Sequence, residues 1–247
     1  MEPVRLEFLG LRFDALSTDA VAATVSARRP GDRFAYIVTP NVDHINRLYA
    51  SPERLRALYD DAWLCLCDSR ILLMLAKLGG QALALAPGSD LTARMFNDVI
   101  KPNDSICIIG GQPDEIEAFA QARSLYHVAH HQPPMGFVND PEEIRKCVEF
   151  VASHPSRYVF FAVGSPQQEI VAHAVFQSNR AVGVGFCIGA SIDFLTGKTA
   201  RAPVWMQKSG LEWLHRLAQN PKRMFGRYIV QGPKVFGIFL RWWWRKR

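Results

Sequence analysis

Cysteine is scarce in this chain and forms no recognisable pairs. The 247 residues include five cysteines, an odd number, with no Cys-x-x-Cys spacing. A disulfide framework or a zinc site is therefore not expected. Four of the five cysteines lie in apolar, strand-like runs, where a buried thiol is the ordinary interpretation. This pattern predicts a protein of a reducing compartment.

Long apolar runs are also missing. A helix needs about 20 apolar residues to cross a bilayer, and the best candidate, residues 235–244, has about half of that length and contains Arg241. The first residues include Glu2, Arg5 and Glu7 in place of an apolar core, so we expect no secretory signal. The sequence predicts a cytoplasmic protein, peripheral on the inner face of the cell membrane, that does not span it.

Metal-binding patterns are absent from the sequence. Asp60-Asp61 is not part of an Asp-x-Asp motif, and no histidine pair has the spacing of metal ligands. We expect His130-His131 to lie in a loop and His44 on the face of a helix. The prediction is a protein with no metal and no cofactor.

Positive charge is concentrated at the C-terminus. Residues 201–247 hold eleven Lys/Arg, one acid and five of the six tryptophans, whereas the first 200 residues carry a net charge of −4 within the total of +6. Cations beside aromatic side chains favour an anionic membrane surface. Burial of Trp242, Trp243 and Trp244 would remove much apolar area from water, which also favours a membrane. A solvated basic face and a nucleic-acid patch are the alternatives.

Apolar strand-like runs alternate with helical patterns over most of the chain. This alternation is typical of a mostly parallel sheet with helices on both faces, here in residues 1–200, and residues 201–247 form a basic helical appendage. A small β element is expected at residues 4–13. The expected strands are 34–38, 63–67, 105–109, 157–163 and 181–186, and the expected helices are 18–28, 43–50, 52–61, 68–77, 90–99, 114–125, 141–152 and one from residue 166.

Small, polar and acidic residues follow the predicted strands. Ligands of open parallel sheets bind beyond the carboxyl ends of the strands. Asp68 comes just after a strand, where a carboxylate acts either as a general base toward a sugar hydroxyl or as the N-cap of the next helix. Asp90, Glu169 and Asp193 have similar alternatives.

Two glycine patterns are candidate phosphate-binding motifs. Gly110-Gly111 precedes the helix from Asp114 and either presents backbone N–H groups to a diphosphate or forms an ordinary turn. Gly183-x-Gly185 lacks the spacing of a dinucleotide fingerprint, so a nicotinamide-dependent dehydrogenase is not expected.

Several of these segments together resemble the WecG/TagA/CpsF family of bacterial glycosyltransferases, also called glycosyltransferase family 26. The resemblance covers residues from about 5 to 230 and is strongest from Gly185 to Arg227. Its motifs are Thr39-Pro40-Asn41, Asp68, Gly88-Ser89-Asp90-Leu91, Gly164-Ser165-Pro166-Gln167-Gln168-Glu169, Gly189-Ala190-Ser191-Ile192-Asp193-Phe194, Arg201-Ala202-Pro203-x-Trp205, Gly210-Leu211-Glu212-Trp213 and Pro221-x-Arg223.

The resemblance implies a Rossmann-like fold and an activity. The activity is transfer of a sugar from a UDP-sugar to a polyprenyl-diphosphate-linked acceptor, with inversion and without a metal, in the synthesis of cell-surface polysaccharide. Asp68 matches the general base of the family. The candidate substrate-binding residues are Thr39, Asn41, Asp90, Gly110, Gly111, Gln168, Asp193 and Arg201.

The resemblance also implies that arginines of the appendage engage the diphosphate. Arg216, Arg223 and Arg227 are separated by seven and four residues, which would place them on one face of a single helix. Attraction to anionic lipid is the other explanation for these charges.

The sequence departs from the family pattern near Asp68. The family has Asp-Gly where this chain has Asp68-Ser69-Arg70, and it has an arginine shortly before the segment that reads Gly88-Ser89-Asp90 here. The hypothesis is that Arg70 supplies the missing charge.

Two further functions stay open: a catalytically degenerate relative that acts as a scaffold, and a nucleic-acid-binding α/β protein, although nucleic acid is not the expected partner. The sugar, the linkage and the oligomeric state cannot be predicted from the sequence.

Overall fold

The protein is built around a six-stranded parallel sheet with the strand order β4-β3-β8-β7-β5-β6. The computed structural model describes residues 4–189, 191, 202–209 and 211–246. The predicted parallel α/β architecture is confirmed, but the strand β6 was not predicted: His130 and His131 lie in it and not in a loop. The strands are β3 (Ala35–Val38), β4 (Leu64–Cys65), β5 (Ser105–Ile109), β6 (His127–His131), β7 (Tyr158–Phe161) and β8 (Val184–Cys187).

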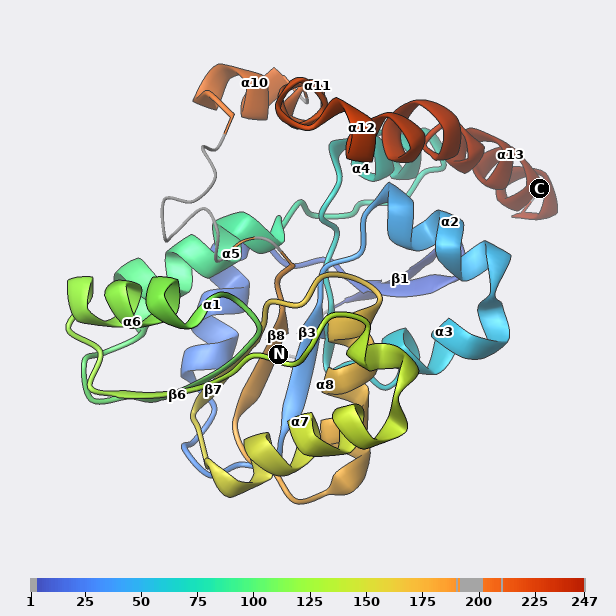
Figure 1. The fold of residues 1–247 in the computed structure, drawn as a ribbon. Coiled ribbons are helices and arrows are strands. Elements are labelled where there is room, and N and C mark those ends of the chain that lie inside the picture. The colour runs from blue at the N-terminus through green and yellow to red at the C-terminus, as the bar shows by residue number, and fades with distance from the viewer. Residues whose placement is uncertain (1–3, 190, 192–201, 210, 247) are drawn as a thin grey trace.

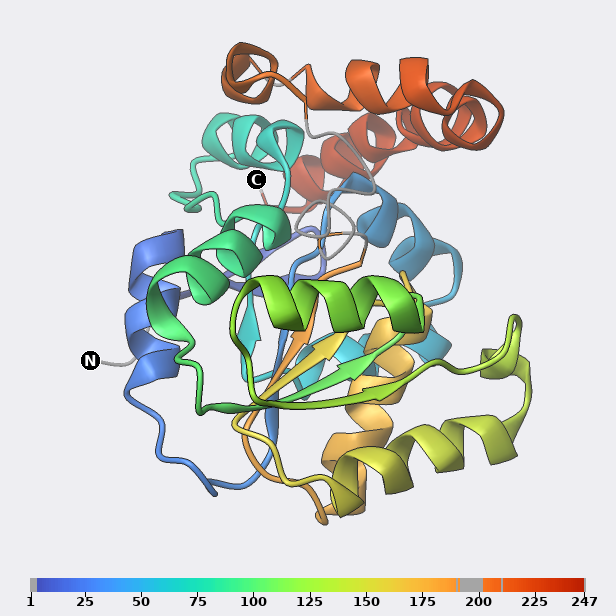
Figure 2. The same ribbon diagram turned by 60° about the vertical axis from the view of Figure 1, so that its left-hand side comes forward.

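Helices cover both faces of the sheet (Figures 1 and 2). Neighbouring residues of one strand contribute to two different cores: Ile106 and Ile108 to one, Cys107 and Ile109 to the other. Both faces are therefore apolar, which explains the nearly continuous apolar strands. One face packs against α1 (Thr18–Ser26), α5 (Gly88–Arg94) and α6 (Pro113–Ala122), and the other against α3 (Pro52–Asp60), α7 (Pro141–Ser153) and α8 (Gln167–Ser178).

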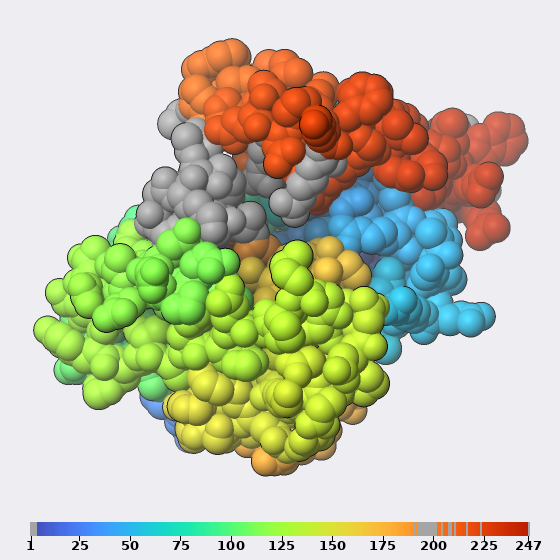
Figure 3. Space-filling model, viewed as in Figure 1, coloured from blue at the N-terminus to red at the C-terminus, as the bar shows by residue number. Residues whose placement is uncertain are grey.

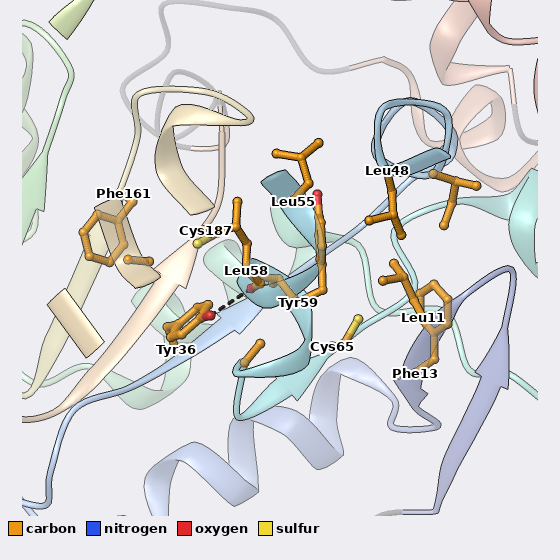
Figure 4. Packing of buried hydrophobic residues seen from close by; sticks show 14 of the residues in the cluster. Leu11, Phe13, Tyr36, Leu48, Leu55, Leu58, Tyr59, Cys65, Phe161 and Cys187 are labelled. Carbon is orange, nitrogen blue, oxygen red and sulfur yellow. Dashed lines mark hydrogen bonds between the residues drawn. The ribbon is translucent and has the colours of Figure 1, made fainter. Parts of the chain in front are cut away.

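A buried hydrogen bond ties α3 to the centre of the sheet. The Tyr36 hydroxyl, from β3, donates to the Leu58 carbonyl at 2.8 Å (Figure 4). Burial raises the pKa of this hydroxyl, so it stays protonated and remains a donor.

All five cysteines are buried and free, and burial was predicted for the four in strand-like runs. Burial raises the pKa of the Cys67 and Cys107 thiols to about 12. These thiols stay protonated at neutral pH and behave as small apolar side chains.

A short hairpin, β1 (Arg5–Phe8) and β2 (Leu11–Asp14), confirms the predicted β element and supports the C-terminal helix. The Phe8 ring lies edge-on to the Trp242 ring, with centroids 5.0 Å apart. Gly79, just after α4 (Arg70–Leu78), also faces Trp242: an added Cβ would lie 2.7 Å from the indole. The hairpin and the end of α4 thus form the surface against which the C-terminal helix packs.

The C-terminal helices cross the end of the molecule at which the parallel strands finish (Figures 1 and 2). They are α10 (Val204–Ser209), α11 (Glu212–Gln219), α12 (Pro221–Phe225), a wider helical turn η3 (Gly226–Gln231) and α13 (Lys234–Lys246). Residues Val235, Ile238 and Phe239 of α13 are buried in the main core. Figure 3 shows these helices as a layer that reaches α2 (Val42–Ala50).

The C-terminal tryptophans have different environments, which corrects the expectation that all three are available to a membrane. Trp242 and Trp243 pack against the core, while Trp244 is 75% exposed. Phe236 and Leu240 are exposed as well, and their spacing of four residues places them in one stripe with Trp244. None of the helices in the described ranges has the length and apolar character needed to cross a bilayer.

Candidate active site

Asp68 lies at the carboxyl edge of the sheet, beside the end of β3. Its backbone N–H donates to the Pro40 carbonyl at 3.1 Å, which extends the pairing of β3 with β4 by three residues beyond β4. The N-cap of α4 is Ser69, whose hydroxyl accepts from the Leu72 N–H at 3.3 Å. The half-buried Asp68 carboxylate is therefore not the cap of this helix, and the alternative explanation for an acid at this position is wrong.

Thr39 connects three segments at the same edge. Its hydroxyl donates to the Cys187 carbonyl, at the end of β8, at 3.4 Å. On the other side lies Gly88, the first residue of α5, where an added Cβ would be 2.9 Å from Thr39 Oγ1. The first turn of α5, which contains the half-buried Asp90, is thereby held against the end of β3.

Asn41 begins α2 as the N-cap. Its side-chain oxygen accepts from the Asp43 N–H at 3.1 Å. His44 Nδ1 lies 3.2 Å from the Asn41 backbone nitrogen and 2.9 Å from Asn41 Oδ1, which completes a capping box. The orientation of Asn41 is thus fixed by His44.

Gln168 and Glu169 lie in the first turn of α8 and are both buried. Gln168 Oε1 accepts from the Gly189 N–H at 2.6 Å, and Gln168 Nε2 donates to Glu169 Oε1 at 2.7 Å. Glu169 Oε1 also lies 3.3 Å from His44 Nε2. One buried carboxylate therefore links Asn41, through His44, with the backbone that follows β8.

The Glu169 carboxyl is ionised despite complete burial. Desolvation would raise its pKa, but His44, Gln168 and Ser165 together hold the pKa below the ordinary value of 4.5. A buried carboxylate is tolerated when it has partners of this kind, which Glu169 has at Oε1.

Gly110 and Gly111 lie at the same edge of the sheet but far from Asp68. Both have positive φ, +97° and +85°, and an added Cβ on Gly110 would lie 2.9 Å from the Ala162 backbone. In the strand order, β5 is four positions away from β4, a distance of about 19 Å. The close approach of the backbone that follows β7 is enough to explain a glycine at position 110. This favours the interpretation of Gly110-Gly111 as an ordinary turn over a diphosphate site.

The sequence of the chain matches the model of the Glycosyl transferase WecG/TagA/CpsF family over residues 6–247, nearly its whole length. The chain belongs to this family. It is a glycosyltransferase with an α/β fold, and the acids, amides and hydroxyls at the carboxyl edge of its sheet form the candidate active site.

The appendage arginines of this glycosyltransferase do not share one helix. Arg216 lies in α11, whereas Arg223 and Arg227 lie in α12 and η3, which follow each other without a break, so the expected single helical face for all three is wrong. The described side chains include that of Arg227, whose Nε lies 3.3 Å from Asp43 Oδ2 on α2. The side chains of Arg216 and Arg223, and all of Asp193 and Arg201, lie outside the described part of the structure.

Three residues of the glycosyltransferase site were not predicted as site residues: Asp43, His44 and Arg47. Arg47 pairs with Asp43 and donates to the Ser165 hydroxyl at 3.2 Å. The spacing of four between Asp43 and Arg47 is a sequence signal for this pair. Arg70, the predicted cation, is exposed on the first turn of α4.

A hollow of about 660 Å³ lies away from the strand ends, between the β1–β2 turn and the end of α13. Tyr49 and Trp242 form part of its wall, together with Arg56, Arg245 and Lys246. Neither Asp68 nor Gln168 lines it, so this hollow is separate from the candidate active site at the carboxyl edge. Within the described ranges no three His, Cys, Asp or Glu side chains are grouped as metal ligands.

Proposed function

We propose that this glycosyltransferase transfers a sugar from a UDP-sugar to a polyprenyl-diphosphate-linked saccharide at the inner face of the cell membrane, with inversion and without a metal. The observation that carries the proposal is the position of Asp68. Asp68 matches the general base of the family by the resemblance described above, it lies at the carboxyl edge beside Thr39 and Asn41, and it does not cap its helix.

In the proposed reaction Asp68 is the general base. An acceptor hydroxyl oxygen attacks the anomeric carbon of the donor while its proton passes to the Asp68 carboxylate. The bond between the anomeric carbon and the β-phosphate oxygen breaks, and UDP leaves with the electron pair. Thr39, Asn41 and Gln168 orient the reactants, and cationic groups stabilise the charge that develops on UDP.

The C-terminal helices supply the membrane-facing surface in this proposal, and the chain divides near residue 200 into a catalytic body and this appendage. One stripe of α13 carries the exposed apolar side chains Phe236, Leu240 and Trp244. The segment 201–247, to which this stripe belongs, is rich in Lys and Arg. An amphipathic helix of this composition lies in the interface plane of an anionic bilayer. In this proposal the whole layer of C-terminal helices, which crosses the end of the molecule at which the strands finish, brings a lipid-linked acceptor to the strand ends (Figure 1).

The test is release of UDP from a panel of UDP-sugars by the full chain, with a polyprenyl-diphosphate-linked saccharide in vesicles as acceptor. Acceptor-dependent release from one donor, with a new product on the lipid, is the expected result. Binding of donor without turnover would favour the scaffold alternative. Salt-sensitive binding of nucleic acid without any donor binding would overturn the proposal.

A further inference from the structure

Arg47 is the side chain of α2 that points from the helix to the end of β7. It donates from Nη1 to the Ser165 hydroxyl at 3.2 Å, in the loop between β7 and α8. Ser165 is close to Gln168 in the chain, and Asn41 begins the helix that carries Arg47. Arg47 is thus a cation in direct contact with the carboxyl-edge site.

Arg47 and Arg227 share one partner carboxylate. Asp43 pairs with Arg47 through one helical turn and, at 3.3 Å, with Arg227 of η3. Two guanidinium groups therefore contact one carboxylate, and the Glu169 carboxylate nearby is buried and already paired with Gln168 and His44. Burial would raise the pKa of the Asp43 carboxyl, but the hydrogen bond from Arg47 and the charge of Arg227 lower it, so this carboxyl is ionised at neutral pH.

The accessibility of Arg47 suits a ligand. Its side chain is 30% exposed, as is that of Arg227, whereas Asp43 is 16% exposed. The guanidinium donors are planar and match the oxygens of phosphate groups.

We propose that Arg47, with Arg227, binds a diphosphate group at the carboxyl edge of the sheet. This inference rests on the proposed function and extends it, since it assigns the stabilising cation to α2 and not to Arg70. The diphosphate belongs either to the nucleotide donor or to the lipid-linked acceptor. In both cases it takes over contacts that Arg47 makes with Asp43 and Ser165.

The experiment measures binding of three probes to the full chain by calorimetry: UDP, farnesyl diphosphate and uridine. Arg47→Ala is expected to weaken binding of at least one diphosphate probe by about tenfold or more, because a charge-assisted hydrogen bond is lost. Binding of uridine, which has no phosphate, stays unchanged. Loss for UDP alone assigns Arg47 to the donor, and loss for farnesyl diphosphate alone assigns it to the acceptor.

Two variants serve as controls. Arg145→Ala removes an arginine that pairs with acids on the exposed face of α7, and it should change no probe affinity. Arg47→Lys keeps the charge without the planar geometry and should retain part of the affinity, which covers the case in which Arg47→Ala does not fold.

The outcomes separate this inference from the proposed function. Wild-type affinity of Arg47→Lys and Arg47→Ala for both diphosphates, with sugar transfer intact in the wild type, overturns the inference alone. Diphosphate binding that depends on Arg47, without sugar transfer from any donor, overturns the proposed function alone. Absence of diphosphate binding in the wild type overturns the inference.

Discussion

His44 of α2 and Glu169 of α8 contact each other inside the protein, with His44 Nε2 3.3 Å from Glu169 Oε1. Both side chains are buried, and each holds a predicted pocket residue: His44 holds Asn41, and Glu169 accepts from Gln168. The side-chain amides of Asn41 and Gln168 thus depend on one contact between two helices that follow different strands. Their positions are fixed before any substrate binds, which is what an active site built on rigid elements requires.

This contact predicts a pH-dependent loss of stability in Glu169→Gln. The folded-state pKa of Glu169 is below 4.5, so its carboxylate stabilises the fold above that pH, and this contribution is lost as the pH falls through the lowered pKa. We expect the variant to lose about 1–3 kcal/mol at pH 7, and the difference from wild type to shrink below pH 4.5. Urea unfolding at several pH values measures both.

Glu117→Gln is the matched control for this prediction, because Glu117 is an exposed glutamate on α6 that accepts only from Gln121. It should leave stability unchanged within about 0.5 kcal/mol. A difference between Glu169→Gln and wild type that is constant from pH 7 to pH 3.5 would contradict the assignment of the effect to the ionised carboxylate.

Substitution of Trp242 and of Trp244 tests which of the two side chains contributes to the stability of the fold. Trp242 packs against Phe8 and faces Gly79, so Trp242→Ala should cost about 2 kcal/mol or more of unfolding free energy. Trp244 is mostly exposed, and Trp244→Ala should change stability by less than about 0.5 kcal/mol. Urea unfolding of the two variants makes the comparison, and equal losses would contradict the packing of α13.

The opposite order is expected for membrane binding. Trp244→Ala removes exposed apolar area next to basic side chains and should weaken binding to anionic vesicles roughly tenfold. The effect should be larger when Leu240, in the same stripe, is also replaced by alanine. Sedimentation with vesicles of anionic and of neutral lipid measures it. Unchanged binding of the double variant would assign the stripe to another partner.

Much of the site was predictable because it follows the strands in the chain. Thr39, Asn41, Asp68 and Gln168 each come just after a strand or begin the next helix, and the carboxyl ends of parallel strands lie on one edge. What the sequence does not contain is the order of the strands. Because β8 lies between β3 and β7, Thr39 contacts Cys187 and Gln168 contacts Gly189, pairs that no local pattern predicts.

The wrong predictions have a common physical cause, which is that local patterns do not show what packs against an element. His130 and His131 are polar, yet they continue a strand because β6 is at the edge of the sheet, next to β5 only. The three tryptophans at the end of α13 look alike in sequence, but the hairpin buries one side of the helix. His44 lies on a helix, as predicted, but the sequence does not show that it is buried against Glu169 of α8.

Gly88→Ala tests the contact between α5 and Thr39. The added methyl would lie 2.9 Å from Thr39 Oγ1, so Thr39 has to rotate or α5 has to move by a few tenths of an ångström. We expect kcat to fall about tenfold or more, since misplacement of a positioning group is costly, with a stability loss of about 1–2 kcal/mol. Gly237→Ala is the control: its Cβ meets nothing within 4 Å, so activity should be unchanged.

Asp68→Asn is the decisive change for the proposed mechanism. Asparagine keeps the size of the side chain and the backbone bond from residue 68 to Pro40, and Ser69 still caps α4, so the fold should be retained. Removal of the proton acceptor should lower kcat by about 10²- to 10⁴-fold, while affinity for UDP changes little, because UDP is bound by cations and not by the base. Asp98→Asn, at an exposed pair with Arg94, should have wild-type kinetics. Sugar transfer at the wild-type rate by Asp68→Asn would remove Asp68 from the reaction, and an equal fall in kcat and UDP affinity would make it a binding group instead.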